Sequence, residues 1–132
     1  MTNKEIKIVN LKNRLRKICS LETCHKSVQD EWTPANPFLG HCAIVSAIAY
    51  NKFGGEIIRA VIAETGFSHY YNRIDNKDYD LTKEQFENKH VTLTDAQPTS
   101  LERILNDANT EYRYHLLKAS LEALPEESND SI

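Results

Sequence analysis

Residues 40–55 read Gly-His-Cys-Ala-Ile-Val-Ser-Ala-Ile-Ala-Tyr-Asn-Lys-Phe-Gly-Gly, and this stretch predicts the central element of the fold. A helix over Cys42–Phe53 would carry apolar side chains on nearly all of its faces. Such a pattern is typical of a helix that the rest of the protein encloses. Gly54 and Gly55 follow the last turn, where glycine commonly ends a helix. We therefore expect a buried helix that begins at Cys42.

Three segments after this helix have the composition of short β-strands. Glu56–Ala63 is rich in β-branched residues and Phe67–Ile74 in aromatic residues, while Asp78–Leu81 follows a cluster of turn-forming residues. Since the connections between the segments are short, we expect the three strands to pair as a small antiparallel sheet.

Further helices are predicted on both sides of this helix and sheet. Residues 4–24 repeat apolar side chains every three or four positions, behind a capping box formed by Thr2 and Glu5. Similar boxes begin at Thr82 and Thr99. The predicted helices are Lys4–Cys24, Cys42–Phe53, a short helix after Thr82, another after Thr99, and Glu111–Leu124, which Pro125 ends. This order of elements predicts an α+β fold.

The composition is that of an ordinary globular domain. The chain has 132 residues, of which 40% are hydrophobic and 27% charged, enough for one hydrophobic core. The longest apolar runs, such as Ala47–Tyr50, are far shorter than the ~20 residues that a membrane-spanning helix needs. The net charge of −3 offers no basic surface for nucleic acid. We therefore expect one domain over residues 1–125, a polar tail over 126–132, and no membrane or nucleic-acid partner.

The three cysteines are Cys19, Cys24 and Cys42, an odd number in a chain whose first residues lead into no apolar secretion signal. Reduced thiols in the cytoplasm are therefore expected rather than a disulfide framework. The cysteines and histidines show no recognisable zinc spacing, and the chain contains no nucleotide-binding loop, so we expect no metal and no cofactor.

The position of Cys42 suggests chemistry. At the start of the buried helix, its sulfur would lie at the positive end of the helix dipole, which favours the thiolate form of a cysteine. A nucleophilic thiol also needs a base and a group that orients the base. His69 on the second predicted strand and Asp80 on the third follow Cys42 in the sequence and could supply both.

The strand register decides whether His69 and Asp80 can meet. Side chains alternate between the two faces of a strand, so His69 shares its face with Tyr71. If the loop between the strands consists of residues 74–77, Tyr71 pairs with Asp80, and Asp80 lies diagonal to His69 on the same face. An odd-numbered loop would place Asp80 on the opposite face. The catalytic interpretation therefore requires an even-numbered loop or a bulge.

Each of the three residues also has an ordinary structural interpretation. Cys42 could be an inert core thiol, because free cysteine is among the most buried residue types. His69 could be a packing residue on an aromatic strand, and Asp80 could support the start of the helix that follows Thr82. The order and placement of the three residues together favour the catalytic interpretation.

A set of short motifs spans residues 32–117. They are Trp32, Asn36-Pro37, Gly40-His41-Cys42, Gly54-Gly55-Glu56-Ile57, Ser68-His69-Tyr70-Tyr71-Asn72-Arg73, Asp80-Leu81-Thr82-x-x-Gln85-Phe86 and Thr110-x-x-Arg113-Tyr114-x-x-Leu117. Together they resemble the YunG-like family of small, uncharacterised bacterial proteins. The resemblance implies a papain-like or transglutaminase-like core, in which a cysteine on a helix meets a histidine on a strand and an acid or amide. This chain has His41 where that family usually carries glutamine.

The resemblance also suggests residues for the oxyanion and the substrate. Asn36 lies six positions before Cys42, the spacing at which papain-like enzymes place a glutamine that stabilises the oxyanion. We therefore expect Asn36 and the Cys42 backbone amide to flank the oxyanion, with the alternative that Asn36 only forms a turn with the following proline. His41, Trp32 and Tyr71 are the other candidates for contacts with the oxyanion or the substrate.

These residues predict a thiol-dependent acyl-transfer enzyme: an amide or ester hydrolase, a deamidase or a transamidase. Cys42 would be the nucleophile, His69 the base and Asp80 the group that orients it. The substrate would be a peptide, a protein side-chain amide, or a small amide or ester. The alternative is a non-catalytic binding or regulatory protein on a papain-like scaffold, because similarity of fold does not establish activity.

Overall fold

Helix α2 (Cys42–Phe53) is the centre of the α+β fold seen in the computed structural model, which describes residues 1–125. Its bounds are those predicted from the sequence. The six consecutive residues 44–49 are buried, and Gly54 follows as the C-terminal cap with φ 74°. The prediction of an enclosed helix is therefore confirmed. The polar tail expected over residues 126–132 lies outside the described residues.

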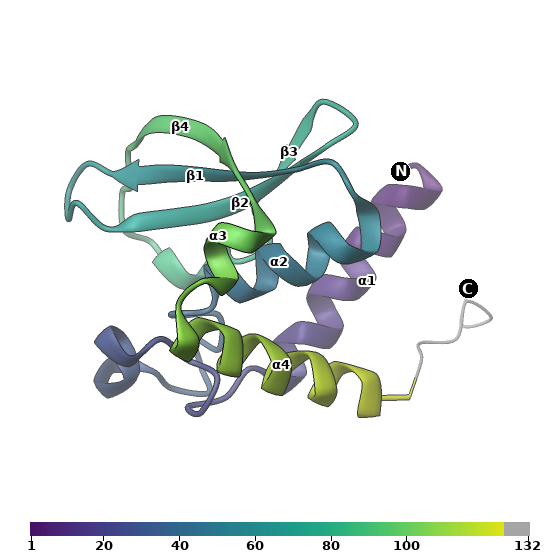
Figure 1. Ribbon diagram of the computed structural model, residues 1–132, viewed down its shortest axis with the longest axis horizontal. Coiled ribbons are helices and arrows are strands. Elements are labelled where there is room, and N and C mark those ends of the chain that lie inside the picture. Colours follow the sequence, from purple (N-terminus) through teal and green to yellow (C-terminus); the bar gives the residue numbers. More distant parts are fainter. Residues whose placement is uncertain (126–132) are drawn as a thin grey trace.

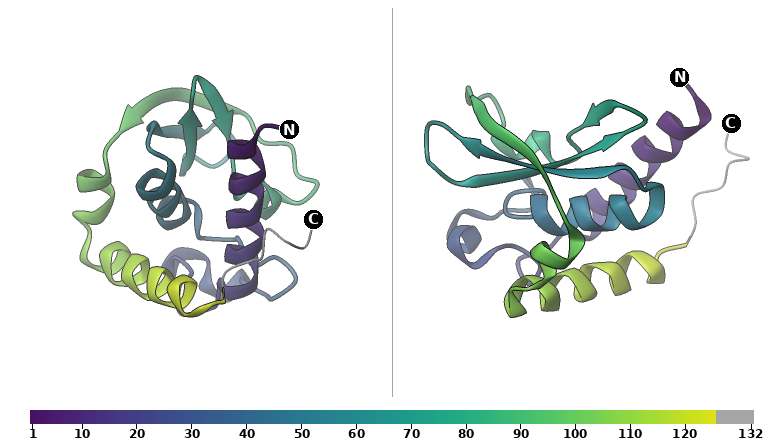
Figure 2. Two further views of the ribbon diagram at one scale, coloured as in Figure 1. Left: turned by 90° about the vertical axis from the view of Figure 1, so that its right-hand side faces the viewer. Right: turned by 45° about the horizontal axis from the view of Figure 1, so that its top comes forward.

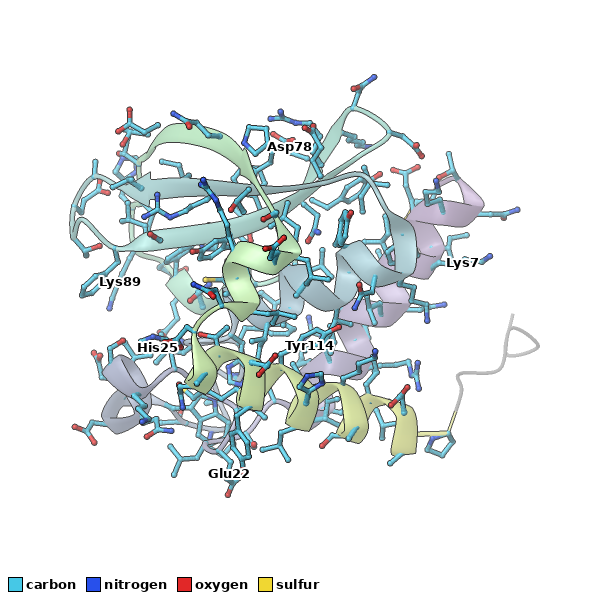
Figure 3. The ribbon with its side chains drawn as sticks, in the orientation of Figure 1. Lys7, Glu22, His25, Asp78, Lys89 and Tyr114 are labelled. Carbon is cyan, nitrogen blue, oxygen red and sulfur yellow. The ribbon has the colours of Figure 1, made fainter. Side chains whose placement is uncertain are left out.

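Two longer helices, α1 (Asn3–Ile18) and α4 (Ala108–Ala123), enclose α2 on the sides that the sheet leaves open (Figures 1 and 2). Leucine, isoleucine and valine side chains of all three helices share one buried cluster. Tyr114 of α4, labelled in Figure 3, accepts a hydrogen bond from the Asn51 side chain at the far end of α2. The two chain ends thus hold α2 in place against the sheet.

The sheet has four antiparallel strands in the order β3-β2-β1-β4. The strands are β1 (Glu56–Ile62), β2 (Ser68–Ile74), β3 (Lys77–Tyr79) and β4 (Leu93–Thr99). In the register of β1 and β2, Ala60 pairs with His69 and Ile58 with Tyr71. Since paired residues point to the same face of a sheet, these four side chains share one face.

The turn between β2 and β3 has the even length that the site hypothesis requires. Ile74 pairs with Lys77, so only Asp75 and Asn76 form the loop, and both have positive φ, as a two-residue hairpin turn needs. The predicted loop of residues 74–77 was two residues too long, but the register is the predicted one. Strand β3 ends at Tyr79, so Asp80 lies just beyond the strand and not within it as predicted.

Strand β4 was not predicted, and its sequence explains why. All residues from 93 to 98 are exposed, so no alternation of apolar and polar residues marks the strand. The segment also contains Pro98. A proline is tolerated at the edge of a sheet, where its missing amide leaves no partner unpaired.

Several helix ends differ from the predictions. The capping box at Thr2 is present, but α1 ends at Ile18 rather than Cys24. After Ile18 the helix gives way to a turn, in which the Ser20 amide donates to the Thr23 hydroxyl at 2.9 Å. Helix α4 begins three residues earlier than predicted, because Asp107 caps it by accepting from the Thr110 amide.

The remaining elements are short. They are the 3₁₀ helices η1 (Lys26–Glu31) and η2 (Lys83–Phe86) and the helix α3 (Leu101–Leu105), which Ser100 caps rather than Thr99. None of the helices in the described part of the chain has the length and hydropathy needed to cross a bilayer.

Candidate active site

Cys42 lies at the N-terminus of α2 and is partly exposed, whereas Cys19 and Cys24 are buried. The first hydrogen bond of the helix runs from the Val45 amide to the His41 carbonyl, so the amides between them have no acceptor within the helix. The His41 side chain does not cap them. The Cys42 sulfur therefore lies beside amide groups at the positive end of the helix dipole.

The His69 ring, carried by β2, contacts both Asp80 and Cys42. Its Nε2 atom lies 2.7 Å from Asp80 Oδ2, and the Cys42 side chain forms a second hydrogen bond with the ring. The His69 side chain is 1% exposed and that of Asp80 20%. The structure thus brings together the three residues that the sequence suggested.

Two aromatic side chains pack against the His69 ring. The ring of Phe86, from η2, meets it edge-on with a centroid distance of 4.9 Å, and the Tyr71 ring lies 6.3 Å away. Phe86 was not among the candidate residues, although it ends the motif that begins at Asp80. The turn that follows Asp80 thus brings Phe86 against the same ring that Asp80 binds.

The pKa of His69 reflects competing influences. Burial is the strongest of them and lowers the pKa, because it disfavours the charged ring. The hydrogen bonds to Asp80 and Cys42, and the attraction of their negative charges, outweigh burial and raise the pKa of His69 to about 9. At neutral pH the ring is therefore an imidazolium between a carboxylate and a sulfur.

His41 is a second buried histidine whose pKa moves in the opposite direction. Its Nδ1 donates to the Leu39 carbonyl at 2.8 Å, and its Nε2 lies 2.7 Å from the Thr23 hydroxyl. Burial is the main cause that lowers the pKa of His41 to about 4, and the charge of Arg113 adds to it. The ring is fully enclosed and both nitrogens are occupied. Both ring nitrogens thus bind groups within the protein, and a contact of His41 with an oxyanion or a substrate stays a prediction.

We predict that the two histidines titrate at opposite ends of the pH scale. In an NMR titration, His69 should lose its proton near pH 9 and His41 near pH 4. Asp80→Asn removes the negative charge beside His69 and should lower the His69 pKa by at least about one unit, since burial then acts with less opposition. The His41 titration serves as the control and should not change. A His69 pKa that stays near 9 in the variant would contradict the assigned contact.

Asn36, the predicted oxyanion donor, binds other parts of the protein. Its Nδ2 donates to the Gln85 carbonyl at 3.0 Å and to the Glu87 carboxylate at 3.1 Å. Both hydrogens of the side-chain amide are therefore used, and neither is free to meet an oxyanion beside Cys42 in this arrangement. The observed role of Asn36 is to fix the loop before α2 to the loop after η2.

Trp32 and Tyr71 also make contacts within the protein. Trp32 Nε1 donates to the Pro37 carbonyl at 3.0 Å and closes the loop before α2. Tyr71 is 8% exposed and packs with Ile58 and Ala60 beside His69. These contacts favour structural roles for both side chains. Among residues 1–125, no group of three or more His, Cys, Asp or Glu side chains is placed to hold a metal ion.

The fold and these contacts define a small α+β protein in which a cysteine at the start of the central helix meets a histidine–carboxylate pair. Residues 7–125 match the model of the family described as YunG protein, so the chain belongs to the YunG family. It is similar to the uncharacterized protein YunG of Bacillus subtilis (strain 168), with 33% identity over 93 residues that cover 67% of this chain and 74% of that protein. No solved structure matches the chain.

Proposed function

We propose that the protein is a thiol-dependent acyl-transfer enzyme with Cys42 as nucleophile, His69 as acid and base, and Asp80 as the orienting carboxylate. The observation that carries this proposal is the His69 ring, whose Nε2 lies 2.7 Å from Asp80 Oδ2 and which also forms a hydrogen bond with the Cys42 side chain. Covalent catalysis by a thiol requires that the nucleophile lie within hydrogen-bonding reach of a base and that a third group orient this base. Cys42 is also partly exposed, whereas the other two cysteines are buried.

In the proposed first step the Cys42 sulfur attacks the carbonyl carbon of an amide or ester. An S–C bond forms and the carbonyl π electrons move to oxygen. When the tetrahedral intermediate collapses, the bond to the leaving group breaks, and His69 gives its proton to the departing amine or alcohol. Water or an amine then attacks the thioester with His69 as base, and the thiolate is released. The nature of this second nucleophile separates hydrolysis and deamidation from transamidation.

The backbone of α2 supplies the group that best fits the oxyanion. The Cys42 amide lies at the uncapped first turn of the helix, beside the reacting sulfur. Amides fixed in that position stabilise negative charge on oxygen without reorganisation. The amide of Cys42 therefore remains the proposed oxyanion donor, whereas the Asn36 side chain is already committed to Gln85 and Glu87.

The same features support a papain-like or transglutaminase-like core. A nucleophilic cysteine begins a buried helix, its histidine is on a strand of an antiparallel sheet, and the acid follows the next strand. The proposed substrates are correspondingly peptides, protein side-chain amides, or small amides and esters. Turnover should fall as the pH rises through about 9, because neutral His69 cannot protonate a leaving group.

We predict that iodoacetamide at pH 6 alkylates Cys42 at least about tenfold faster than the other two thiols. Burial raises the pKa of Cys24 to about 11 and that of Cys19 still further, so both remain protonated and enclosed. Peptide-resolved mass spectrometry measures the three rates in one sample. p-Nitrophenyl acetate should in addition leave one acetyl group on Cys42.

The control for this experiment is the same protein unfolded in guanidinium chloride, in which the three thiols should react at similar rates. Slow, equal alkylation of all three thiols in the folded protein would contradict the proposed function. A reactive Cys42 that never becomes acetylated would indicate a binding or regulatory protein instead of an enzyme.

A further inference from the structure

Arg113 is a buried cation whose hydrogen-bond partners are neutral. It is 2% exposed, the largest side chain among those that are almost completely buried. Its guanidinium donates to the Thr23 carbonyl at 3.2 Å, to the Thr110 hydroxyl at 3.2 Å and to the Asn109 side-chain oxygen at 2.9 Å. No ion pair within residues 1–125 includes Arg113.

This location disfavours a charge unless an anion compensates it. Burial of an ion costs several kcal/mol, and a buried charge is therefore normally paired. Arg113 also lies in the second turn of α4, close to the helix N-terminus, where the dipole disfavours a cation. Asp107, the N-cap of the same helix, is exposed, and its carboxylate accepts from the Thr110 amide and hydroxyl. A neutral side chain of similar length could make the same packing contacts without this cost.

A short chain of hydrogen bonds leads from Arg113 to the start of α2. The guanidinium holds the Thr23 carbonyl, and the Thr23 hydroxyl lies 2.7 Å from His41 Nε2. His41 is the residue that immediately precedes Cys42. Arg113 thus supports, from α4, the same helix end that carries the reactive sulfur.

We propose that Arg113 is a positioning residue of the active site, whose buried charge stabilises the anionic sulfur of Cys42 and whose contacts fix the N-terminus of α2. The inference rests on the proposed function, because Cys42 gives the guanidinium an anion in addition to Asp107 only when Cys42 is a thiolate. Arg113 does not touch the substrate. It acts through the electrostatic field at the helix end and through Thr23 and His41.

The pKa shifts around Arg113 agree with this assignment. Burial lowers the pKa of Arg113, and the nearby acidic groups, among them Asp107 and Cys42, oppose that effect when they are ionised. The same guanidinium helps to keep His41 neutral, so His41 does not compete as a cation for the sulfur. The sulfur also contacts His69, which in turn binds Asp80.

The charge around the sulfur therefore comes from groups on different elements. The titratable groups whose charges act on Cys42 or on Arg113 lie on several elements. They are Cys24 before η1, His25 at the cap of η1, His41 before α2, His69 on β2 with its partner Asp80 after β3, and Asp107 before α4. His25, labelled in Figure 3, carries a pKa lowered by burial and by Arg113, and it is therefore mainly neutral at pH 7. His69 and Arg113 are then the two cations at the site.

The test is Asn109→Asp, which places a carboxylate where Arg113 Nε now donates to an amide oxygen of nearly the same shape. An acidic residue in the first turn of α4 also suits the helix dipole, so stability should be unchanged or higher. The new carboxylate neutralises the guanidinium, and the pH midpoint of Cys42 alkylation should rise by about one unit. The rate at pH 6 should correspondingly fall about tenfold. A purely structural role predicts no such change.

Three further variants complete the experiment. Asn109→Ala removes the acceptor without adding charge and should leave the midpoint near that of the original protein. Arg113→Lys keeps the charge and should do the same, whereas Arg113→Gln removes it and should shift the midpoint as Asn109→Asp does. Thermal melts verify that each variant is folded.

The outcomes distinguish this inference from the proposed function. If Cys42 reacts fast in the original protein and its midpoint is the same in folded Asn109→Asp or Arg113→Gln, the role of Arg113 is refuted and the function stands. An equal shift in Arg113→Lys and Arg113→Gln would also refute it, because packing rather than charge would then be responsible. If Cys42 is no more reactive than an ordinary buried thiol, the proposed function itself fails.

Discussion

Replacement of Cys42 by alanine should abolish acyl transfer, with turnover of a small ester lowered by at least ~10³-fold. The reason is that only this thiol combines exposure with contact to a histidine, while Cys19 and Cys24 are enclosed. Cys42→Ser is the more informative variant, since its hydroxyl nearly keeps the size of the side chain but is a much weaker nucleophile than a thiol. It should be as inactive as the alanine variant and as stable as the original protein.

The chain offers a matched control for this experiment. Cys19 is 8% exposed and belongs to the main core cluster, so Cys19→Ala should lower the free energy of unfolding slightly and leave turnover intact. Release of nitrophenol, corrected for the solution reaction, measures both variants. Undiminished turnover in Cys42→Ala would show that the ester reacts at another site.

Gly40→Ala should lower the free energy of unfolding by about 3 kcal/mol. Gly40 has φ +76°, a conformation that costs an L-residue about 1 kcal/mol or more. An added Cβ would lie 2.6 Å from Cys24 Sγ, 2.8 Å from Val28 Cγ2 and 3.0 Å from the His25 amide nitrogen. Overlap in a packed region of this kind costs a further 1–3 kcal/mol or so. Urea titration measures the loss.

Gly66→Ala is the control that separates the two causes. Gly66 has φ +78°, but an added Cβ there would meet nothing within 4 Å. Only the backbone cost remains, so the loss should be about 1 kcal/mol. Equal losses at the two positions would show that the space around Gly40 is not filled as the structure indicates. Because Gly40 lies two residues before Cys42, its alanine variant should also slow alkylation of Cys42.

Much of the fold could be predicted because the spacing of apolar residues and the capping or turn residues at the ends of each element indicated the same helices and strands. α2 combines an apolar sequence, a preceding turn and a following pair of glycines, and its bounds were predicted correctly. α1 lacked such a stop signal. Its helical pattern continued to Cys24 in the sequence, but a Ser20–Thr23 turn replaced the last turns of the helix. Strand β4 could not be predicted, because an exposed edge strand carries no pattern of burial.

Only some of the contacts in the candidate active site could be predicted from the sequence. The alternation of side chains on β2 and the even turn length fixed which face Asp80 would approach. The distance between His69 and the start of α2, by contrast, depends on how the helix packs beneath the sheet, and no local pattern encodes that. The same applies to Asn36 and Arg113, whose partners lie on segments distant in sequence.

All three reacting groups come from the uninterrupted run of chain between residues 42 and 80, whereas α1 and α4, which cover the central helix, come from the two ends (Figure 1). Transient detachment of α4 would therefore expose one side of α2 to water and move Arg113 away from it. The proposed nucleophile, base and acid, which lie on other elements, would stay in contact. If Arg113 has the proposed role, movement of the terminal helices would change the electrostatic environment of the Cys42 sulfur and leave its contacts with His69 and Asp80 in place. A molecule that binds α4 and stabilises or weakens its packing would then be expected to raise or lower the activity by degrees rather than to abolish it.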